Sequence, residues 1–412
     1  MSNAVQMNTP PSLPNRPDLT IWLVVVGGIV SLAVAMGIGR FAFTPLMPLM
    51  LRDGTLSAAT GAEWAAANYI GYLLGALTAA RIPDPRRGLK LALFGVALTT
   101  LAAVWTGGGA PALLGVLLRG AAGVFSAWAL VFTSSWGLAE LAQRQAPQLG
   151  AWIYVGVGLG IVVAGVLAWL GGQQPARWLW LEMGLLAGAG AIFVALKLRQ
   201  GRGAAAVAVA PALSSPARVE SSGQLPLVLC YGTFGFGYIV PATFLPAMAR
   251  QQVSDPLVFG LTWPLFGLAA ALSVVAAARY LSAWPRRRVW AVAQGTMALG
   301  TALPLATHAL WALAACAVLV GGTFMVATMA GLQLAREWMP ANPTPLLARM
   351  TVAFATGQIL GPLLVRALGT GTVAGWNALT WANAAATVLL LLTAAWLWRD
   401  STTPSTSTKP LR

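Results

Sequence analysis

Long apolar segments recur along most of this 412-residue chain, and they constrain its fold more than any other feature. A helix that crosses a lipid bilayer needs about 20 predominantly apolar residues. Clusters of charge, proline and glycine divide the sequence into twelve segments of that kind. They are expected at 19–43, 61–80, 89–106, 111–138, 149–171, 178–197, 225–248, 257–278, 288–306, 309–335, 347–368 and 374–398. The predicted fold class is therefore an all-α integral membrane protein with twelve transmembrane helices.

The composition excludes an ordinary soluble fold. Only 8% of the residues are charged and 58% are hydrophobic, whereas soluble chains carry about 25% charged residues. This leaves too little polar surface to cover a core of this size. Soluble globular, disordered and coiled-coil classes are therefore excluded.

Basic residues are distributed unevenly between the two predicted sides of the membrane. The chain holds 25 lysines and arginines against 10 acidic residues, for a net charge of +15. If the N-terminus is cytoplasmic, most basic residues fall in cytoplasmic loops and tails, as the positive-inside rule requires. The outer loops hold only Arg52, Arg177, Arg250 and Arg366. We therefore predict that both termini are cytoplasmic and that the positive charge reflects topology rather than a nucleic-acid partner.

The breaks between segments also divide the chain into domains. Residues 1–18 are polar and proline-rich, as in a cytoplasmic tail rather than a cleaved signal peptide. Residues 199–224 are rich in Ala, Ser, Pro and Gly, so we expect a flexible cytoplasmic linker there. This linker separates two six-helix halves at 19–198 and 225–398, and 399–412 form a second cytoplasmic tail.

The two halves carry an internal repeat. Residues 37–52 read GIGRFAFTPLMPLMLR and residues 235–250 read GFGYIVPATFLPAMAR, with matches at a constant offset of 198. The same offset places Arg40 opposite Tyr238, so a charge breaks the symmetry of the repeat. Two parallel six-helix halves are typical of secondary transporters, whose substrate site lies near the membrane midplane between the halves.

With this layout, the chain from 19 to 398 resembles the major facilitator superfamily. The string GIGRFAFTPLMPLML is similar to the YbfB/YjiJ-type branch of bacterial transporters. The resemblance implies a multi-pass secondary transporter of the bacterial inner membrane that moves a small-molecule substrate by alternating access. Because two halves of one chain can form the whole pathway, we expect a functional monomer.

Two further motifs are similar to those of the superfamily. The loop after the second helix, GALTAARIPDPRRG, resembles a gating motif, with Ala79 in place of an acidic residue. The residues that match it are Gly75, Arg81, Arg86 and Arg87. In the fourth helix, Arg119, Gly123 and Ala127 resemble a pattern associated with proton-coupled exporters, with Ala122 in place of its usual glutamine.

Charged side chains inside the hydrocarbon region are costly and are therefore candidates for function. Arg40 lies within the first predicted helix and could bind a carboxylate or phosphate through a bidentate contact. The alternative is that its side chain extends to the membrane interface. Arg119 could likewise bind substrate, bond the backbone carbonyls of a neighbouring helix, or pair with an acid.

Polar and aromatic residues of the predicted cavity helices complete the candidate substrate site. They are Asn68, Tyr69, Tyr72, Trp128, Tyr154, Tyr231, Tyr238 and Gln358. For each, the alternative is an interhelical hydrogen bond or a packing aromatic. Glu63 is the deepest acidic residue and the candidate for proton coupling, and no carboxylate is predicted at mid-membrane.

Two membrane arginines with few acids favour an anionic substrate, so we predict a secondary transporter of a small organic anion. The alternative is a proton-coupled exporter of neutral or apolar compounds. A membrane enzyme is a remote alternative, because catalysis needs a converging set of acid, base or nucleophile groups. The chain has one histidine, His308, and two isolated cysteines, Cys230 and Cys316, so no metal or other cofactor is predicted.

Overall fold

The computed structural model describes residues 19–107, 112–146, 149–200, 224–253, 255–281, 283–339 and 344–400. The predicted tail at 1–18, nearly all of the predicted linker and the end of the second tail lie outside these residues. The predicted domain boundaries therefore stay predictions.

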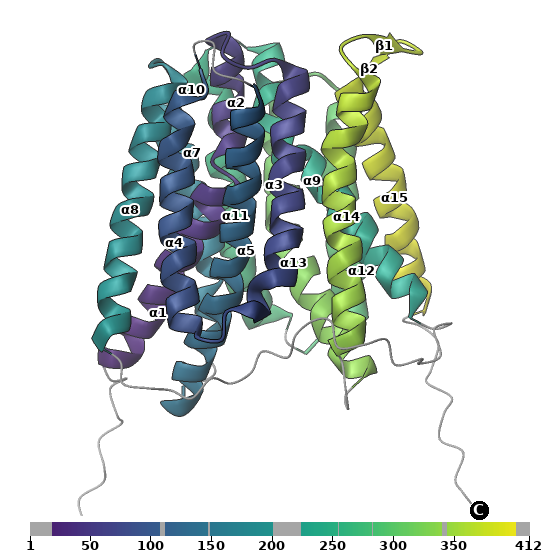
Figure 1. The fold of residues 1–412 in the computed structure, drawn as a ribbon. Coiled ribbons are helices and arrows are strands. Elements are labelled where there is room, and N and C mark those ends of the chain that lie inside the picture. Colours follow the sequence, from purple (N-terminus) through teal and green to yellow (C-terminus); the bar gives the residue numbers. More distant parts are fainter. Residues whose placement is uncertain are drawn as a thin grey trace, which may run out of the picture.

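The N-terminal half is built from helices that run back and forth along one common axis (Figure 1). The first span is interrupted and consists of α1 (Leu19–Leu32), the π-helix η1 (Ala33–Arg40) and α2 (Phe43–Arg52). The later elements of this half are α3 (Ala58–Thr78), η2 (Ala79–Arg81), α4 (Pro85–Ala102), η3 (Ala103–Thr106), α5 (Ala112–Gln143), α6 (Gly150–Ile153), α7 (Val155–Leu170) and α8 (Ala176–Gln200).

The C-terminal half repeats this arrangement. Its elements are α9 (Leu225–Gln252), α10 (Pro256–Phe259), α11 (Thr262–Tyr280), α12 (Arg286–Ala306), α13 (Leu310–Trp338), α14 (Thr344–Leu368), the strands β1 (Thr372–Val373) and β2 (Trp376–Asn377), and α15 (Ala378–Asp400). The described chain begins and ends at the same end of the bundle, which we call the terminal side (Figure 1). The opposite end, which carries the β1–β2 hairpin, is called the distal side.

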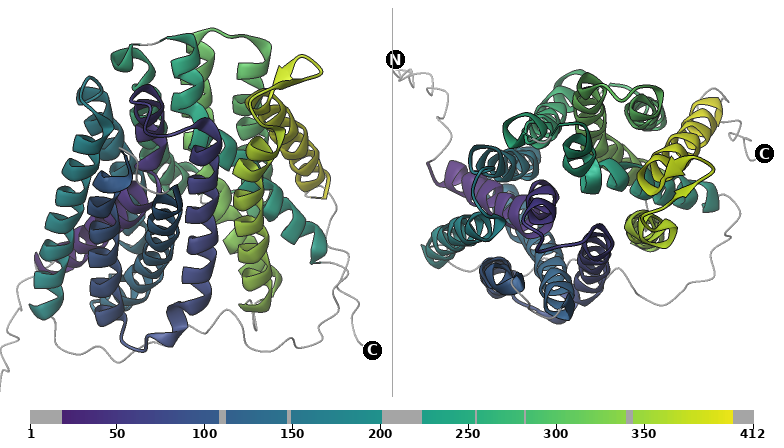
Figure 2. Two further views of the ribbon diagram at one scale, coloured as in Figure 1. Left: turned by 45° about the horizontal axis from the view of Figure 1, so that its top comes forward. Right: turned by 90° about the horizontal axis from the view of Figure 1, so that it is seen from above.

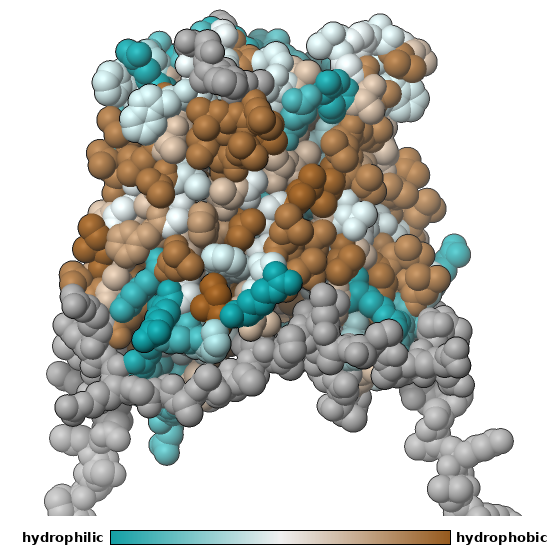
Figure 3. Space-filling model, in the orientation of Figure 1, coloured by the Kyte–Doolittle hydropathy of each residue, from teal (hydrophilic) through white to brown (hydrophobic). Residues whose placement is uncertain are grey.

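Eleven helical segments of the described residues are long and apolar enough to cross a membrane. The remaining predicted segment, 61–80, is the helix α3, which is less apolar because it includes Glu63 and Asn68. Large apolar side chains such as Leu98 and Leu392 are more than half exposed on the outside of the bundle. Figure 3 shows an apolar belt with hydrophilic residues towards its two ends. The predicted all-α membrane fold is confirmed.

The first span is longer than the predicted segment 19–43, because it continues to Arg52. Pro45 and Pro48 both lie in α2, with Pro45 in its first turn, where no intrahelical N–H bond is lost. Proline is therefore a poor marker of the end of this span. At the other end of the chain, the hairpin of residues 372–377 delays the start of the last helix to Ala378.

The two halves meet mainly through α3 with α14, α7 with α11, and α2 with α9, and the short helix α10 also contacts α7. Seen from above, the halves lie on opposite sides of the bundle centre (Figure 2). Glycine allows the close approach of α7 and α11, since a Cβ on Gly267 would lie 2.7 Å from the backbone nitrogen of Val162.

The internal repeat is also visible in the ion pairs on the terminal side. In the N-terminal half, Arg86 at the start of α4 lies 2.6 Å from Glu140 near the end of α5. In the C-terminal half, Arg286 at the start of α12 lies 3.7 Å from Glu337 near the end of α13. Each pair joins the third and fourth long helices of its own half.

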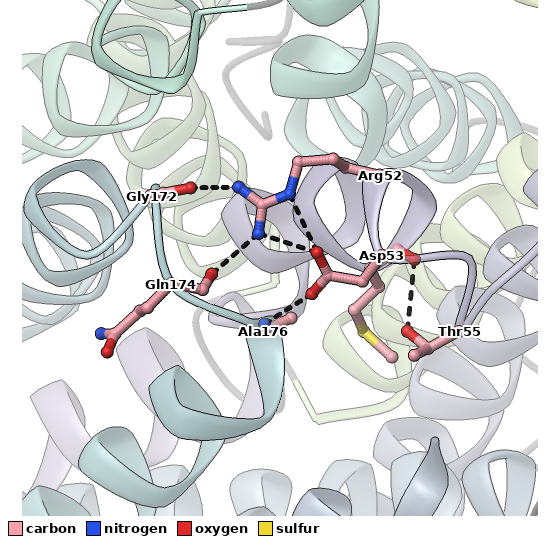
Figure 4. A network of polar contacts seen from close by, with 7 residues as sticks. Arg52, Asp53, Thr55, Gly172, Gln174 and Ala176 are labelled. Carbon is pink, nitrogen blue, oxygen red and sulfur yellow. Dashed lines mark hydrogen bonds and ion pairs between the residues drawn. The ribbon is translucent and has the colours of Figure 1, made fainter. Parts of the chain in front are cut away.

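On the distal side, a polar network ties the loop after α2 to the loop before α8 (Figure 4). The guanidinium of Arg52 donates to the carbonyl oxygens of Gly172 and Gln174, the latter at 2.7 Å. Asp53 binds Arg52 at 2.8 Å and accepts a bond from the backbone N–H of Ala176 at 2.7 Å. The network lies within one half and so favours its movement as a unit.

Candidate functional site

The first span breaks at Arg40, in the second half of its length. η1 ends at this residue, Phe41 and Ala42 form a turn, and α2 begins at Phe43. The Phe41 N–H donates to the carbonyl of Met36, five residues earlier, at 3.0 Å. This is the hydrogen-bond spacing of a π-helix. Segments of π-helix are frequent at functional sites, because they redirect side chains and free backbone groups.

Arg119 and Asn68 bind the backbone at this break. The Arg119 guanidinium donates to the carbonyl oxygens of Gly39 at 3.1 Å and of Arg40 at 2.9 Å. The Asn68 amide donates to the Arg119 carbonyl at 2.9 Å and to that of Gly39 at 3.5 Å. Both side chains are buried. Arg119 thus bonds the backbone carbonyls of a neighbouring helix, which is one of the alternatives to substrate binding. Its role in substrate binding stays a prediction.

Arg40 is buried, with 3% of its surface exposed, and its side chain reaches across to the other half of the bundle. Its Nη2 donates to the hydroxyl of Tyr238 at 3.3 Å. The guanidinium carbon lies 4.0 Å from the ring centre of Tyr72 and 5.3 Å from that of Tyr69. Aromatic faces attract a cation at such distances, which holds the guanidinium between the halves.

Arg40 lies next to the axis that relates the two halves. Its partner Tyr238 is its own equivalent in the repeat, 198 positions later. Thr44 and Ala242 show the same relation, because the Thr44 hydroxyl donates to the Ala242 carbonyl at 2.8 Å over an identical separation. Two positions that a pseudo-twofold axis exchanges can touch only close to that axis. The contact therefore marks the centre of the bundle.

The C-terminal half supplies an aromatic stack and an amide at the same place. The ring of Tyr238 is stacked on Phe324 and Phe354, with ring centres 5.5 and 5.6 Å away. The Gln358 amide donates to the Tyr238 hydroxyl. Tyr231 lies next to this stack, 5.2 Å from Phe354 between ring centres. Four predicted site residues, Arg40, Tyr72, Tyr238 and Gln358, thus form one continuous cluster.

Hydrogen bonds between the halves are concentrated on the distal side of this cluster among the described residues. The Tyr69 hydroxyl lies 2.8 Å from that of Thr243, and the Trp169 indole donates to the Leu257 carbonyl at 2.8 Å. Among the described residues, the hydrogen bonds that we find between the halves lie at the level of Arg40 or beyond it towards the distal side.

Glu63 takes part in one of these distal contacts. Its carboxylate lies 2.7 Å from Arg366 of α14, and both side chains are roughly half exposed. The predicted proton-coupling residue is thus one partner of an ion pair between the halves. Its role in coupling stays a prediction.

Trp128 and Tyr154 have their hydrogen-bond partners inside the N-terminal half. The Trp128 indole donates to the Thr78 hydroxyl at 3.0 Å, and the Tyr154 hydroxyl lies 2.9 Å from that of Ser134. Tyr154 itself lies at the junction of α6 and α7. Neither contact reaches the Arg40 cluster.

The predicted gating motif surrounds the start of α4 on the terminal side. Gly75 lets α3 approach α5, since a Cβ there would lie 2.8 Å from the Cα of Val124. Asp84 caps α4 by accepting the Arg86 N–H at 2.9 Å and also pairs with Arg87 at 3.3 Å. The Arg81 side chain is exposed.

Several residues of this region were not predicted from the sequence. They are Thr44, Thr243, Phe324, Phe354 and Arg366. Of these, only Thr44 could have been selected from the sequence, because it lies four residues after Arg40 inside the repeat.

Neither Arg40 nor Arg119 has a carboxylate within ion-pair distance among the residues that the structure describes. The Nε of Arg40 and the Oε1 of Gln358 are buried without a hydrogen-bond partner. A buried charge without a partner is costly. The cluster therefore has one guanidinium N–H without an acceptor and one amide oxygen without a donor.

Comparison with known proteins agrees with this architecture. Residues 32–395 match a family model described as uncharacterised MFS-type transporter YbfB. No curated protein matches the sequence.

Solved structures of transporters share the fold at low sequence identity. A D-xylose–proton symporter superposes with a TM-score of 0.74 at 14% identity, covering 95% of this chain and 100% of that one. The nucleoside transporter NupG gives 0.68 at 13%, covering 94% and 100%. A bacterial homolog of the human lysosomal transporter Spinster, in an inward-facing and occupied conformation, gives 0.62 at 13%, covering 95% and 98%. The predicted resemblance to the major facilitator superfamily is confirmed.

Proposed function

Because this chain belongs to the MFS-type transporter family described for YbfB, we propose that it is a secondary active transporter of a small organic anion, bound by Arg40. Family and fold are those of a transporter rather than an enzyme. One observation carries the anion assignment. A buried guanidinium at the contact between the halves has no described carboxylate to neutralise it.

Anion binding at Arg40 would couple directly to movement of the halves. Arg40 belongs to the N-terminal half and its acceptor, the Tyr238 hydroxyl, to the C-terminal half. A carboxylate or phosphate is a stronger partner than a neutral phenol, because its charge is opposite to that of the guanidinium and its oxygens can accept two parallel N–H bonds. When the substrate binds Arg40, the bond from Arg40 to Tyr238 breaks and a bond from Arg40 to the substrate replaces it. The halves then lose one contact with each other, as alternating access requires.

The other predicted residues support Arg40 in different ways. Arg119 and Asn68 position it by binding the carbonyls at the break in the first span. Gln358 and Tyr238 present polar groups from the opposite half. Tyr69 and Tyr231 add aromatic surfaces next to the cluster, and Trp128 and Tyr154 are the candidate contacts of the N-terminal half beyond it.

The terminal side is the cytoplasmic side in this proposal, and the membrane is the bacterial inner membrane. Basic side chains at the loops of this side, including Arg81, Arg86, Arg144 and Arg279, fit the positive-inside rule. The chain works as a monomer, since the site lies between its own two halves. Protons are the coupling ion that we propose, with Glu63 as the candidate carrier.

A proton-coupled exporter of neutral or apolar compounds is the second candidate. The observation in its favour is the aromatic surface formed by Tyr238, Phe324 and Phe354. In that case Arg40 would hold the halves together and leave the substrate to the rings. The two functions differ in whether binding depends on the charge of Arg40.

Thermal stability of the detergent-purified protein tests the proposal. A ligand that binds only the folded state stabilises it by about 2.7 kcal/mol at a concentration of 100 times Kd. We expect a carboxylate or phosphate to raise the melting temperature of the wild type, with no effect on Arg40→Gln. Arg177→Gln, which removes an exposed arginine on the distal side, is the matched control and should respond like the wild type.

If only amines or neutral compounds stabilise the protein, and do so equally in Arg40→Gln, the anion proposal is wrong. Flux into proteoliposomes with an imposed pH gradient then tests the exporter. If instead an anion stabilises the wild type and not Arg40→Gln, that anion should enter or leave the vesicles faster with the wild type than with Arg40→Gln.

A further inference from the structure

Aromatic rings enclose the Arg40 guanidinium on the N-terminal half. Tyr72 lies against it at 4.0 Å, and Tyr69 and Phe41 each lie at 5.3 Å from ring centre to guanidinium carbon. The N–H groups of the guanidinium that do not bond Tyr238 are therefore surrounded by aromatic rings on this side. A ligand that reaches these groups must place its body against rings.

The opposite wall, on the C-terminal half, is also aromatic. The rings of Phe324, Tyr238 and Phe354 are nearly parallel, with interplanar angles of 7° and 8° to Tyr238. Tyr238 is itself an aromatic ring with an oxygen on the guanidinium. It shows what kind of group this space accommodates: a flat ring whose polar end points at Arg40.

The rings next to the buried contact are more exposed than the contact itself. Arg40 and Tyr238 are 3% and 2% exposed, whereas Tyr72 and Phe354, which contact them directly, are partly exposed. The partly exposed rings thus form an outer layer over the buried contact. When the two halves separate, a ligand passes between these ring faces before it meets the guanidinium.

The charge of the site limits the charge of the ligand. Arg119 donates from both of its terminal nitrogens to the carbonyls of Gly39 and Arg40. Arg40 is then the one buried cation that the described part of the cluster offers to a ligand. A single guanidinium matches one carboxylate in a bidentate pair, and a second anionic group would lie unpaired among rings.

We infer that the substrate is a planar aromatic monocarboxylate, with its carboxylate on Arg40 and its ring between Tyr72 of one half and the Tyr238–Phe354 stack of the other. This inference rests on the proposed function and narrows its substrate class. Aromatic pairs add binding free energy beyond the burial of area, in offset or edge-to-face geometry. That addition is what separates an aromatic acid from an aliphatic acid of equal size.

A matched set of ligands tests the inference on the wild-type protein, without depending on any variant. Benzoate, cyclohexanecarboxylate, benzamide and terephthalate differ in turn in planarity, charge and number of carboxylates. We expect thermal-shift titration to give an affinity for benzoate about three- to tenfold higher than for cyclohexanecarboxylate. Benzamide and terephthalate should bind more weakly than benzoate.

A pair of variants then localises the preference. Phe354→Leu should reduce the ratio of benzoate to cyclohexanecarboxylate affinity towards one. Phe236→Leu is the matched control, because Phe236 lies in α9 two residues before Tyr238 but packs in a separate apolar cluster with Val240 and Ala382. Its ratio should stay that of the wild type.

The outcomes separate this inference from the proposed function. Equal affinities for benzoate and cyclohexanecarboxylate, both lost in Arg40→Gln, would overturn the aromatic assignment and leave the anion transporter in place. If terephthalate binds more tightly than benzoate, the assignment of a single carboxylate to the substrate is wrong. If no carboxylate binds, or if Arg40→Gln binds them as well as the wild type, the proposed function fails and this inference fails with it.

Discussion

Arg40 and Arg119 are both buried guanidinium groups, but their partners differ in kind. Arg119 donates to two backbone carbonyls, those of Gly39 and Arg40, where the first span is broken. Arg40 donates to a neutral phenol instead, while the Nε of each guanidinium is buried without a hydrogen-bond partner. Arg119 therefore maintains structure at the break, whereas the charge of Arg40 is held without an equivalent stabilising partner.

This difference predicts opposite effects on stability. Arg119→Gln leaves buried carbonyls without donors, at about 1–3 kcal/mol for each group left unpaired. We expect it to lower the melting temperature by several degrees. Arg40→Gln removes a buried charge that lacks a counterion, so the melting temperature of the ligand-free protein should stay level or rise. Melting followed by tryptophan fluorescence measures both.

Arg119→Lys is the control that keeps the charge. Lysine cannot reproduce the planar fork that reaches two carbonyls at once, so this variant should also be less stable than the wild type. A lysine variant as stable as the wild type would show that charge alone matters at this position.

At the scale of the elements, the site depends on close packing around the broken first span. η1 lies against α7, where Gly37 faces Gly160, and a Cβ on Gly37 would lie 2.6 Å from the Gly160 carbonyl oxygen. Small residues let helices approach closely in a membrane, where packing rather than the hydrophobic effect drives association. The position of Arg40 is thus set by helix-to-helix contact a few residues before it.

A larger side chain should separate these two elements. We expect Gly37→Val to cost about 1–3 kcal/mol, as overpacking does in a close-packed interior, and to weaken anion binding because it displaces Arg40. Gly188→Val in α8 is the control, since a Cβ there has no neighbouring atom within 4 Å. Melting temperature and ligand affinity of the two variants provide the comparison. Equal loss in both would show that the effect is general to glycine replacement.

At the scale of the whole molecule, the bonds between the halves hold its distal side closed. The Glu63–Arg366 pair, at 2.7 Å, joins α3 to α14 on that side. Because the pair is roughly half exposed, it contributes only about 0.2–1 kcal/mol. A contribution of that size is suited to an equilibrium that must reverse in each transport cycle.

Loss of this pair should increase the population that is open on the distal side. Thr44→Cys, in the contact with Ala242, provides a reporter against a low background, because the native Cys230 and Cys316 are buried. We expect Glu63→Gln to raise its labelling rate by a membrane-impermeant maleimide by up to about fivefold. The exchange of charges, Glu63→Arg with Arg366→Glu, should restore slow labelling. Fast labelling in the exchanged pair would exclude an ionic gate here.

The sequence predicts the helices and the centre of this molecule better than it predicts the contacts around that centre. Hydropathy alone locates the spans, because lipid imposes a length and a composition on each of them. The repeat also pairs Arg40 with Tyr238, and the structure shows the two in contact. Hydropathy and an internal repeat can both be recognised from the order of the residues alone.

Contacts that depend on rotation and depth cannot be recognised in this way. The acceptors of Arg119 are backbone carbonyls, which every residue possesses, so no sequence pattern marks them. Glu63 and Arg366 are separated by 303 positions and meet because α3 packs on α14. The break after Arg40 is equally hidden, since Pro45 and Pro48, the visible helix breakers, both lie beyond it in α2.

The contact of Arg40 with its own repeat equivalent has a consequence for how such a chain can arise by duplication. Residues on a twofold axis meet their own copies, as in an isologous dimer interface. A tandem fusion of two identical halves with arginine at this position would press two guanidinium groups together, and the closed state would be opposed by like charges. Two tyrosines there would close without a charge to select a ligand. Divergence at this single pair of positions is therefore what allows a symmetric scaffold to carry a solitary charge at its centre.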